Sequence, residues 1–400
     1  MLSTAARPYI EASVPVLQAH GLAITTTFYK NMFNAHPELK NLFNMGNQAN
    51  GSQQQSLAAA VFAYAANIDN AQALQPVIDR IVHKHAAVGI KPAHYPIVGR
   101  HLLGAIAEVL GEAATPPLIA AWDEAYWLLA GEFIAAESRL YQSTGYAADQ
   151  WIETRIVETA TVAEGVLSIV LAAAEGETLP AFKAGQYISV AVTLPDGSRQ
   201  IRQYSLSDAE QKTTYRISVK REAGGTQMPQ GTVSNWLHQY ANVGGQLLVS
   251  HPYGEFTPDL NNSEPLVLIS AGVGITPMLA MLKTLVQRQS TRGIWFLHAG
   301  RSLQYVPHLE ELGASQQSLP QLNLALYLED QPVVETAVSV HNGRMRLAEW
   351  PFNAALNAQY YLCGPLPFMI EQWQALLALG IPAQQIHREV FGPESLNQAG

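Results

Sequence analysis

Two histidines lie two residues apart in a segment with helical periodicity, and only one of them can face a buried site. In the segment 75–88, His83 and His85 are separated by about 200° around a helix axis. His85 shares a face with apolar residues such as Ile78 and Ile81, whereas His83 shares the polar face with Asp79. A histidine on an apolar face is either a hydrogen-bonded core residue or a metal ligand, and the spacing alone favours the core residue.

A glycine turn stands at the end of an apolar run later in the chain. The stretch 270–277 reads Ser-Ala-Gly-Val-Gly-Ile-Thr-Pro, and it follows the strand-like segment Leu266–Ser270. Only two glycines, Gly272 and Gly274, are present, and Pro277 stands where a helix begins, so the third glycine of the dinucleotide-binding fingerprint is missing. By itself this turn is weak evidence for a nucleotide site.

The overall composition limits what these residues can belong to. The 400 residues are 48% hydrophobic and 14% charged, with a formal net charge of −9. This balance predicts packed globular domains and argues against a partner that carries a phosphate backbone or an anionic lipid surface. The single cysteine, Cys363, cannot form an internal disulfide, and residues 1–11 lack an apolar signal core. We therefore expect small-molecule partners, a cytoplasmic location and a monomer. Because glycines and Pro277 interrupt the uncharged stretch 266–282, we expect no transmembrane segment.

The periodicity changes twice along the chain, which predicts three domains. Residues 1–141 have helical spacing, with short breaks at Pro37–Phe43 and Pro92–Pro96, a polar loop at Gly46–Ser52, and Tyr29 in a second helix. Residues 151–259 contain short alternating strands and are expected to form an antiparallel β-barrel. Residues 264–400 alternate buried-type strands with helices, which is typical of a parallel α/β fold. The strands expected in the last two domains are Val166–Leu171, Tyr187–Thr193, Tyr215–Val219, Leu266–Ser270, Ile294–His298, Leu322–Leu328 and Tyr360–Leu362.

Several short strings in the helical third resemble the globin family, and specifically the haem domain of flavohaemoglobins. They are Phe28-Tyr29-Lys30, Leu42-Phe43-Asn44-Met45, Asn47-Gln48, His83-Lys84-His85 and Ile90-Lys91-Pro92 with His94-Tyr95.

The resemblance implies that His85 is the proximal ligand of haem b. It also implies that Phe43 packs on the macrocycle, and that Tyr29, Gln53 and Leu57 form the distal pocket. The family places a carboxylate on the last helix of this domain, where Glu137 stands here, with Tyr95 as the accompanying hydroxyl. A carboxylate that accepts the second ring hydrogen makes the imidazole a stronger donor to iron. Glu137 as a solvated helix residue is the alternative, since most glutamates are exposed.

The remainder of the chain resembles the ferredoxin reductase family. Arg202-Gln203-Tyr204-Ser205 follows a strand and matches the Arg-x-Tyr-Ser pattern, in which a cation and a hydroxyl meet the flavin pyrophosphate and the tyrosine packs on the ring. Tyr187 and Ser234 belong to two further matching strings, and Gly231 opens a loop into a helix whose N-terminal N–H groups suit phosphate. The nicotinamide dinucleotide is assigned to the turn Gly272-Val273-Gly274-Ile275-Thr276-Pro277, with Cys363 in the facing loop.

The C-terminal string completes the likeness to flavohaemoglobins. Glu389-Val390-Phe391-Gly392-Pro393 would lie against FAD, with Glu389 between flavin and haem, and Lys84 is a second candidate for that boundary. Each of these two charges has a plain surface position as its alternative, and Cys363 has that of a free buried thiol.

The resemblance implies an NAD(P)H-dependent nitric oxide dioxygenase. Electrons would pass from NAD(P)H through FAD to haem, and nitric oxide would be oxidised to nitrate with oxygen held at the haem. Two other functions remain open: an oxygen-binding or gas-sensing protein, and a reductase of peroxides or lipid hydroperoxides. Arg301 follows the strand Ile294–His298 and is placed to meet the 2′-phosphate of NADPH, although a solvated arginine is as probable from the sequence.

Overall fold

The protein is represented by a computed structural model that describes residues 2–68, 70–210, 213–225, 230–330, 338–347 and 357–392. It forms two compact units. The helical unit contains the residues up to Trp151 and also takes in Ala191–Arg202, and the sheet unit contains Ile152–Val190 and Gln203–Phe391. Within the described part of the chain, no helix has the length and apolar character needed to cross a membrane.

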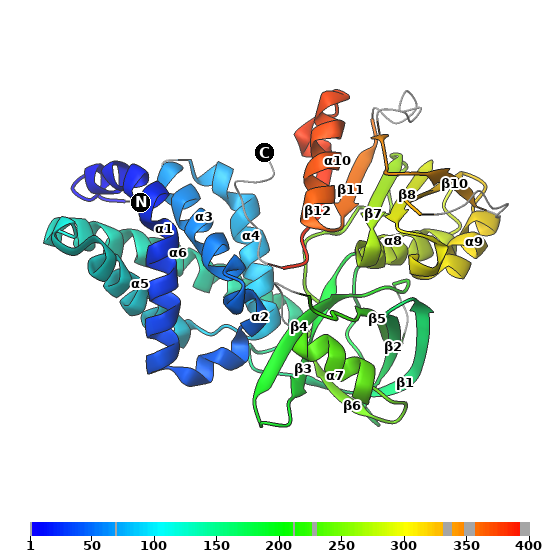
Figure 1. The fold of residues 1–400 in the computed structure, drawn as a ribbon, viewed down its shortest axis with the longest axis horizontal. Coiled ribbons are helices and arrows are strands. Elements are labelled where there is room, and N and C mark those ends of the chain that lie inside the picture. The colour runs from blue at the N-terminus through cyan, green and yellow to red at the C-terminus, as the bar shows by residue number, and fades with distance from the viewer. Residues whose placement is uncertain are drawn as a thin grey trace. The chain divides into compact units, whose positions relative to one another are not determined.

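The helical unit is built from six α-helices and short 3-10 turns among its described residues (Figure 1). Two of the helices, α1 and α6, have 29 residues each, and the rows of apolar side chains along α1, α5 and α6 form one core. The elements are α1 (Arg7–Ala35), η1 (Pro37–Leu42), α2 (Met45–Ala49), α3 (Ser52–Ala66), α4 (Ala71–Val88), η2 (Pro92–His94), α5 (Tyr95–Leu110), η3 (Gly111–Ala113) and α6 (Pro116–Thr144).

Two details of this unit differ from the sequence expectations. Helix α1 continues through Pro15, so Tyr29 lies on the first helix and not on a second one. The segment expected as a polar loop contains helix α2, because the side chain of Asn44 caps it by accepting hydrogen bonds from the backbone of Gly46 and Asn47. The interpretation of this segment gave too much weight to Gly46 and too little to the capping residue.

The first part of the sheet unit is a six-stranded barrel in the order β4-β3-β6-β1-β2-β5. Strand β1 pairs antiparallel with β2 and β6, and β2 pairs antiparallel with β5. A bridge between Leu206 and Ile217 joins the two ends of the sheet and closes it. The elements are β1 (Ile152–Ala163), β2 (Val166–Ala173), β3 (Tyr187–Thr193), β4 (Arg199–Ser205), β5 (Thr214–Lys220), α7 (Thr232–Tyr240) and β6 (Gln246–Val249).

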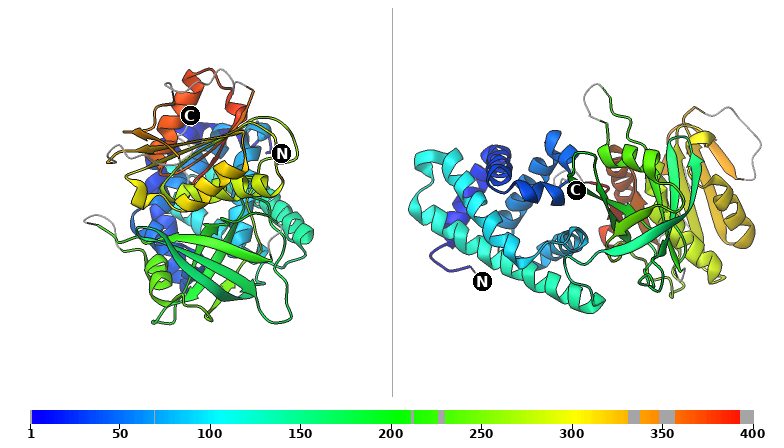
Figure 2. Two further views of the ribbon diagram at one scale, coloured as in Figure 1. Left: turned by 90° about the vertical axis from the view of Figure 1, so that its right-hand side faces the viewer. Right: turned by 90° about the horizontal axis from the view of Figure 1, so that it is seen from below.

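The second part is a six-stranded parallel sheet in the order β10-β9-β8-β7-β11-β12. Helices α8 and α9 pack against one face of the sheet, and α10 packs against the other (Figure 2). The elements are β7 (Leu266–Ala271), η4 (Gly272–Gly274), α8 (Ile275–Gln287), β8 (Ile294–Gly300), η5 (Leu303–Tyr305), α9 (Leu309–Ser318), β9 (Leu322–Leu328), β10 (Ser339–Asn342), β11 (Gln359–Cys363), α10 (Leu366–Ala378), η8 (Ala383–Gln385) and β12 (Ile386–Glu389).

The expected fold class is therefore confirmed: a helical domain, an antiparallel barrel and a parallel α/β domain. The strand order reverses between β7 and β11, and in open parallel sheets ligands bind outside the carboxyl ends of the strands at such a point. One expectation about local structure was wrong. Arg202-Gln203-Tyr204-Ser205 does not follow a strand but forms the second half of β4.

Candidate functional site

His85, Glu137 and Tyr95 meet in the helical unit, each from a different helix. His85 Nδ1 lies 2.7 Å from Glu137 Oε1, and the Tyr95 hydroxyl donates to the same oxygen at 2.6 Å. His85 Nδ1 and the Tyr95 hydroxyl are 3.3 Å apart. The Glu137 side chain is only 2% exposed, so it is not the solvated residue of the alternative interpretation. One buried carboxylate oxygen thus holds both the imidazole and the phenol.

Tyr95 is held in place by α6 as well as by its own helix. The Tyr126 hydroxyl donates to the backbone carbonyl of Tyr95 at 2.6 Å. Gly99 makes room for this contact, because a Cβ at that position would lie 2.5 Å from the Tyr126 ring. Burial and the neighbouring charge of Glu137 raise the pKa of Tyr95 far above its usual range, so the phenol remains a hydrogen-bond donor.

The geometry around His85 fits an axial haem ligand. Nδ1 is engaged by Glu137, and Nε2 has no hydrogen-bond partner among the residues that the structure describes. The side chain is 33% exposed, and Phe133 packs 5.7 Å from the ring. A neutral imidazole whose Nδ1 hydrogen is held by a carboxylate presents the Nε2 lone pair to a metal. If haem binds here, His85 would hold its iron.

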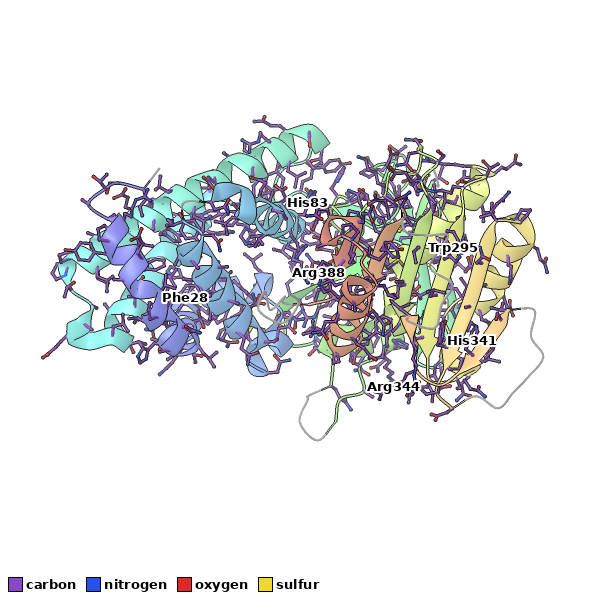
Figure 3. The ribbon with its side chains drawn as sticks, turned by 90° about the horizontal axis from the view of Figure 1, so that it is seen from above. Phe28, His83, Trp295, His341, Arg344 and Arg388 are labelled. Carbon is purple, nitrogen blue, oxygen red and sulfur yellow. The ribbon has the colours of Figure 1, made fainter. Side chains whose placement is uncertain are left out.

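Tyr29 is the centre of a second cluster in the same unit, together with Gln53, Gln48 and Phe43. Burial raises the pKa of Tyr29 to about 12, while hydrogen bonds with the side chains of Gln53 and Gln48 act in the opposite direction. Phe43 meets the Tyr29 ring edge-on at 5.8 Å. Phe28, marked on α1 in Figure 3, is 4.7 Å from the same ring. Tyr29 is therefore a buried, protonated hydroxyl between aromatic rings and two glutamine side chains.

Of the expected distal residues, the structure brings Tyr29 and Gln53 together, and Leu57 packs against the same core from α3. Phe43, expected to pack on the macrocycle, lies beside Tyr29. Gln48 was missed as a site residue because its segment was interpreted as a loop. It lies on α2, and Gln54 Nε2 donates to its side-chain oxygen at 3.1 Å. Asn44, which caps α2, is the signal in the sequence that could have found it.

In the barrel, alternation along β4 separates the four residues of the expected flavin motif. Arg202 and Tyr204 share one face of the strand, and Gln203 and Ser205 share the other. The Arg202 guanidinium donates to the Ile201 carbonyl at 2.7 Å and to Gln200 at 3.3 Å. Tyr187 is buried on β3. A guanidinium and a phenol on one strand face are suited to a pyrophosphate and a flat ring, so these residues fit FAD.

Ser234, which the sequence assigns to the flavin site, lies in the first turn of α7. Its hydroxyl donates to the Gly231 carbonyl at 3.2 Å and accepts from the Glu222 backbone at 3.2 Å. A side chain at position 231 would collide with Ser234, since a Cβ there would lie 2.6 Å from its hydroxyl oxygen. Ser234 thus fixes the loop that leads into α7, whose first N–H groups lack partners within the helix.

Two loops meet at the carboxyl ends of β7 and β11, where the parallel sheet changes direction. Gly272 has a φ of +53°, and Thr276 ties the turn by donating to the Val273 carbonyl at 2.9 Å. A Cβ on Gly274 would lie 2.3 Å from the Cys363 carbonyl oxygen, so the two loops pack backbone against backbone. Such a cradle fits a dinucleotide, which needs close backbone approach. Ile275 and Pro277 are buried in the first turn of α8.

The remaining expected residues are placed as follows. Cys363 and Glu389 are paired in register on β11 and β12, and both are buried. Val390 is half-buried, whereas Phe391 and Gly392 are exposed, and Pro393 lies outside the described residues. Lys84 is half-buried on α4 between His83 and His85 (His83 is marked in Figure 3). The Arg301 guanidinium lies 3.8 Å from the centre of the Tyr305 ring, at the carboxyl end of β8.

Comparison with known proteins agrees with this division of the chain. Three family models match: "Globin" at residues 26–133, "Oxidoreductase FAD-binding domain" at residues 153–257, and "Oxidoreductase NAD-binding domain" at residues 268–374. The expected cofactor set of haem, FAD and a nicotinamide dinucleotide is thereby confirmed at the level of domains. The protein is an NAD(P)H-linked oxidoreductase with haem and flavin domains.

Full-length relatives carry the same domain order. The flavohemoprotein of Rhizobium meliloti is 44% identical over 98% of this chain and 99% of its own length. Among solved structures, the flavohemoglobin of Malassezia yamatoensis with bound FAD and heme aligns with a TM-score of 0.87 and 33% identity, covering 98% of this chain and all of that one. The flavohem-like FAD/NAD-binding domain of nitric oxide dioxygenase from Vibrio cholerae is 36% identical, with a TM-score of 0.54, over 60% of this chain and 99% of that domain. The resemblance expected from the sequence is confirmed, and the chain belongs to the flavohaemoglobin (flavohemoprotein) family.

Proposed function

We propose that the protein is a nitric oxide dioxygenase that oxidises nitric oxide to nitrate at the expense of NAD(P)H. Nitric oxide, dioxygen and one electron make one nitrate ion, so the two electrons of one NAD(P)H supply two turnovers. Bound haem would supply the iron that activates dioxygen, and bound FAD would divide the hydride into single electrons. The observation that carries the proposal is the pairing of a buried, protonated Tyr29 with the His85–Glu137 contact in one helical domain.

Each residue of the helical domain has a distinct part in this proposal. Glu137 holds the Nδ1 proton of His85, which raises the basicity of the ring, and Tyr95 orients that carboxylate. Tyr29 donates its hydroxyl hydrogen to a gas ligand in the pocket, and Gln53 orients Tyr29. Phe43 and Leu57 exclude water. The Vibrio relative named as a nitric oxide dioxygenase supports the same reaction.

We propose the cofactor contacts in the same way. Arg202, Tyr204 and Ser205, with Tyr187, Gln203 and Ser234 nearby in the barrel, would hold FAD. The turn Gly272–Pro277 would hold the nicotinamide dinucleotide beside Cys363. The segment Val390–Pro393 would lie against FAD, and Glu389 and Lys84 are the candidates for the boundary between flavin and haem. The domain limits 1–141, 151–259 and 264–400, a monomeric state and a cytoplasmic location belong to this proposal too.

A second function is favoured by the same proximal contact. An imidazole that a carboxylate makes electron-rich also promotes cleavage of an O–O bond, so a hydroperoxide reductase is the alternative. It makes no use of nitric oxide, which separates it from the first proposal.

Rapid mixing of the reduced protein with dioxygen and then nitric oxide tests the proposal. We expect one nitrate for each nitric oxide consumed, at a rate far above that with alkyl hydroperoxides. Tyr29→Phe should lose about tenfold or more of this turnover and release dioxygen faster, since a hydrogen bond to a charged acceptor contributes about 1.5–3 kcal/mol. Adding Phe28→Tyr to the Tyr29→Phe variant should not restore the turnover, because the hydroxyl then lies at the neighbouring position. Absence of nitrate would leave gas binding or hydroperoxide reduction as the function.

A further inference from the structure

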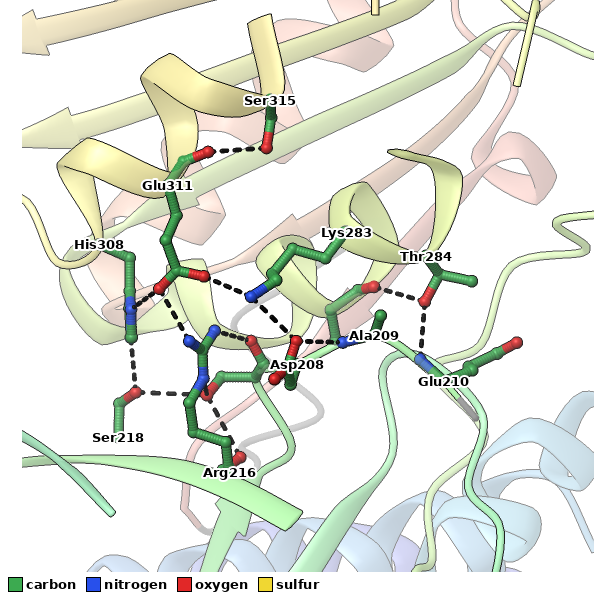
Figure 4. Close-up of polar contacts among 12 residues, drawn as sticks. Asp208, Ala209, Glu210, Arg216, Ser218, Lys283, Thr284, His308, Glu311 and Ser315 are labelled. Atoms are coloured by element: carbon green, nitrogen blue, oxygen red, sulfur yellow. Dashed lines mark hydrogen bonds and ion pairs between the residues drawn. The ribbon is translucent and has the colours of Figure 1, made fainter. Parts of the chain in front are cut away.

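A cluster of charged side chains joins the barrel to the parallel-sheet domain within the sheet unit (Figure 4). Asp208 follows β4, Arg216 lies on β5, Lys283 lies on α8, and His308 and Glu311 lie at the start of α9. These five residues are called the clasp below. None of them belongs to the flavin or nucleotide motifs described above.

Glu311 is the centre of the clasp. Its Oε1 accepts from the Arg216 guanidinium at 2.8 Å and lies 2.6 Å from His308 Nδ1, and its Oε2 accepts from the Lys283 ammonium at 2.5 Å. Burial would raise the pKa of Glu311, but the hydrogen bond with His308 and the charges of Arg216 and Lys283 hold it well below its usual range. Glu311 is therefore ionised, and both of its oxygens are bound.

The barrel side of the clasp is attached directly to the end of the flavin motif. Arg216 donates from Nε to the Ser207 hydroxyl at 3.2 Å and from its terminal nitrogen to the Ser207 carbonyl. Ser207 lies two residues after Ser205, beside the Leu206–Ile217 bridge that closes the barrel. Lys283 adds a second tie, 2.9 Å from Asp208 Oδ1. The backbone that carries Tyr204 and Ser205 is thus anchored to α8 and α9.

On the other side, the clasp fixes the loop that follows β8. His308 has a left-handed φ of +59°, which costs free energy for a residue other than glycine. Its Nε2 lies 2.8 Å from the Ser218 hydroxyl of the barrel, and its backbone N–H donates to the Val162 carbonyl at 3.2 Å. Glu164 of the same barrel hairpin donates its backbone N–H to the Gln304 carbonyl at 2.8 Å. The loop 303–308 is held to the barrel at both of its ends.

The side chains of these ion pairs are 10–29% exposed, so they are largely shielded from solvent. Such pairs add little net stability, because desolvation offsets most of the attraction, but they restrict geometry. Two domains of one chain otherwise move relative to each other by default. Hydride transfer needs the reacting atoms within about 3–3.5 Å, and a misplacement of about 1 Å can cost a factor of about 100 in rate. The clasp joins the segment that follows β4, where the flavin motif ends, to the loop that follows β8. It therefore acts on the distance between the reacting atoms of the two domains.

We propose that the clasp positions the two reductase domains for hydride transfer, and that Glu311 and Arg216 are its principal positioning residues. In this step a C–H bond of the reduced nicotinamide breaks and an N–H bond of the flavin forms, so the coenzyme is oxidised and FAD is reduced. The proposal rests on the NAD(P)H-linked reductase activity alone. It stands or falls independently of nitric oxide oxidation.

Glu311→Gln tests the proposal, with Glu310→Gln as the matched control because Glu310 is an exposed neighbour on the same helix. In the FAD-loaded protein, stopped-flow absorbance gives the limiting rate of flavin reduction and the dissociation constant of the coenzyme. We expect Glu311→Gln to lower the limiting rate by about tenfold or more. The dissociation constant of the coenzyme should remain within about threefold of wild type. The FAD content should remain near that of wild type.

A measurement that does not depend on activity accompanies the kinetics. Hydrogen exchange of the backbone amides in segment 303–312 should be faster in Glu311→Gln than in Glu310→Gln, because the clasp no longer holds the loop. If Glu311→Gln fails to retain FAD, the same measurements pass to Ser218→Ala, which removes the side-chain contact of His308 with the barrel and the 3.4 Å contact between the Ser218 and Ser207 hydroxyls. A limiting rate within about twofold of the control, or a loss confined to coenzyme affinity, would overturn the proposal.

Discussion

The helical unit and the sheet unit each contain a central carboxylate, and the two carboxylates are bound in opposite ways. Glu137 in the helical unit uses one oxygen for both His85 and Tyr95, and its Oε2 has no hydrogen-bond partner among the described residues. Glu311 in the sheet unit has both oxygens bound by Arg216, Lys283 and His308. Glu137 meets one imidazole and one phenol, whereas Glu311 meets two permanent cations.

The difference separates tuning from positioning. A carboxylate that meets an imidazole and a phenol and keeps a spare lone pair can hold the Nδ1 hydrogen of His85 more or less strongly, so it can adjust how strongly the imidazole donates to a metal. A carboxylate saturated by cations keeps its charge, and its contribution is to hold geometry.

Removing the imidazole that Glu137 serves would have the largest effect. We expect His85→Ala to abolish stable haem binding and to leave FAD bound, because the FAD-binding and NAD-binding domain matches begin only at residue 153. The Soret absorbance and the flavin absorbance of the purified protein report the two cofactors separately. His83→Ala should keep both signals, and a normal haem spectrum in His85→Ala would refute the assignment.

Changing Glu137, or the tyrosine that donates to it, tests the tuning role directly. Glu137→Gln should slow haem reduction by about tenfold, because an amide oxygen accepts the imidazole hydrogen more weakly. The two variants Glu137→Gln and Tyr95→Phe should shift the iron–histidine vibration in opposite directions. In Tyr95→Phe, His85 has the carboxylate oxygen to itself. Resonance Raman spectroscopy of the ferrous protein measures that vibration. Shifts of the same sign in both variants would contradict the shared-oxygen geometry.

His298 is a buried base in the sheet unit that does not belong to the clasp. His298 is fully buried with its Nδ1 2.9 Å from the Ser270 hydroxyl, and burial lowers its pKa to about 3. Between about pH 6.5 and pH 3 the unfolded chain binds a proton here and the folded chain does not, so stability falls as pH falls.

The loss expected from His298 approaches about 1.4 kcal/mol for each pH unit below 6.5. Urea unfolding of the flavin-loaded protein, followed by flavin fluorescence at pH 7 and pH 5, measures it. His298→Asn should reduce the difference in the free energy of unfolding between pH 7 and pH 5, whatever its effect on stability at pH 7. The exposed-histidine variant His341→Gln serves as the control, and an equal pH dependence in His298→Asn would rule out this residue as the cause.

The smallest expected effect concerns a cation outside the clasp. Arg301 stacks on Tyr305 and remains exposed, so its guanidinium can meet a 2′-phosphate without breaking a buried ion pair. We expect Arg301→Ala to lower kcat/KM about tenfold with NADPH and less than twofold with NADH. Equal behaviour with both coenzymes would remove Arg301 from the coenzyme site.

The elements that could be predicted from the sequence are those with strong local signals. The expected strands Tyr187–Thr193 and Leu322–Leu328 have the bounds that the structure gives, because each is a mostly apolar run bounded by turn residues. Helix α2 was missed because Gly46 and several asparagines resemble a turn, and one cap outweighs them. In the site, the helical-face argument placed His85 inward, and the structure gives it Glu137 as partner.

The clasp could not have been predicted from the sequence by the same reasoning. Arg216 and Glu311 are 95 positions apart, and each is surrounded by other charged residues, including Lys220 and Glu310. No periodicity distinguishes Glu311 from Glu310, although the first is bound by two cations and the second is exposed. Long-range ion pairs depend on how sheets and helices are stacked, which local spacing does not encode.

The position of Cys363 has a consequence for chemical durability. Its side chain is fully buried on β11, and burial with the nearby Glu389 charge raises the pKa of the thiol well above its usual range. Thiolates, not thiols, react with oxidants and with nitrosating agents. Free nitric oxide and dioxygen react in solution to form such agents, and the reaction proposed above would take place in their presence. A cysteine kept protonated and out of contact with solvent would leave the loop after β11 unreactive toward them.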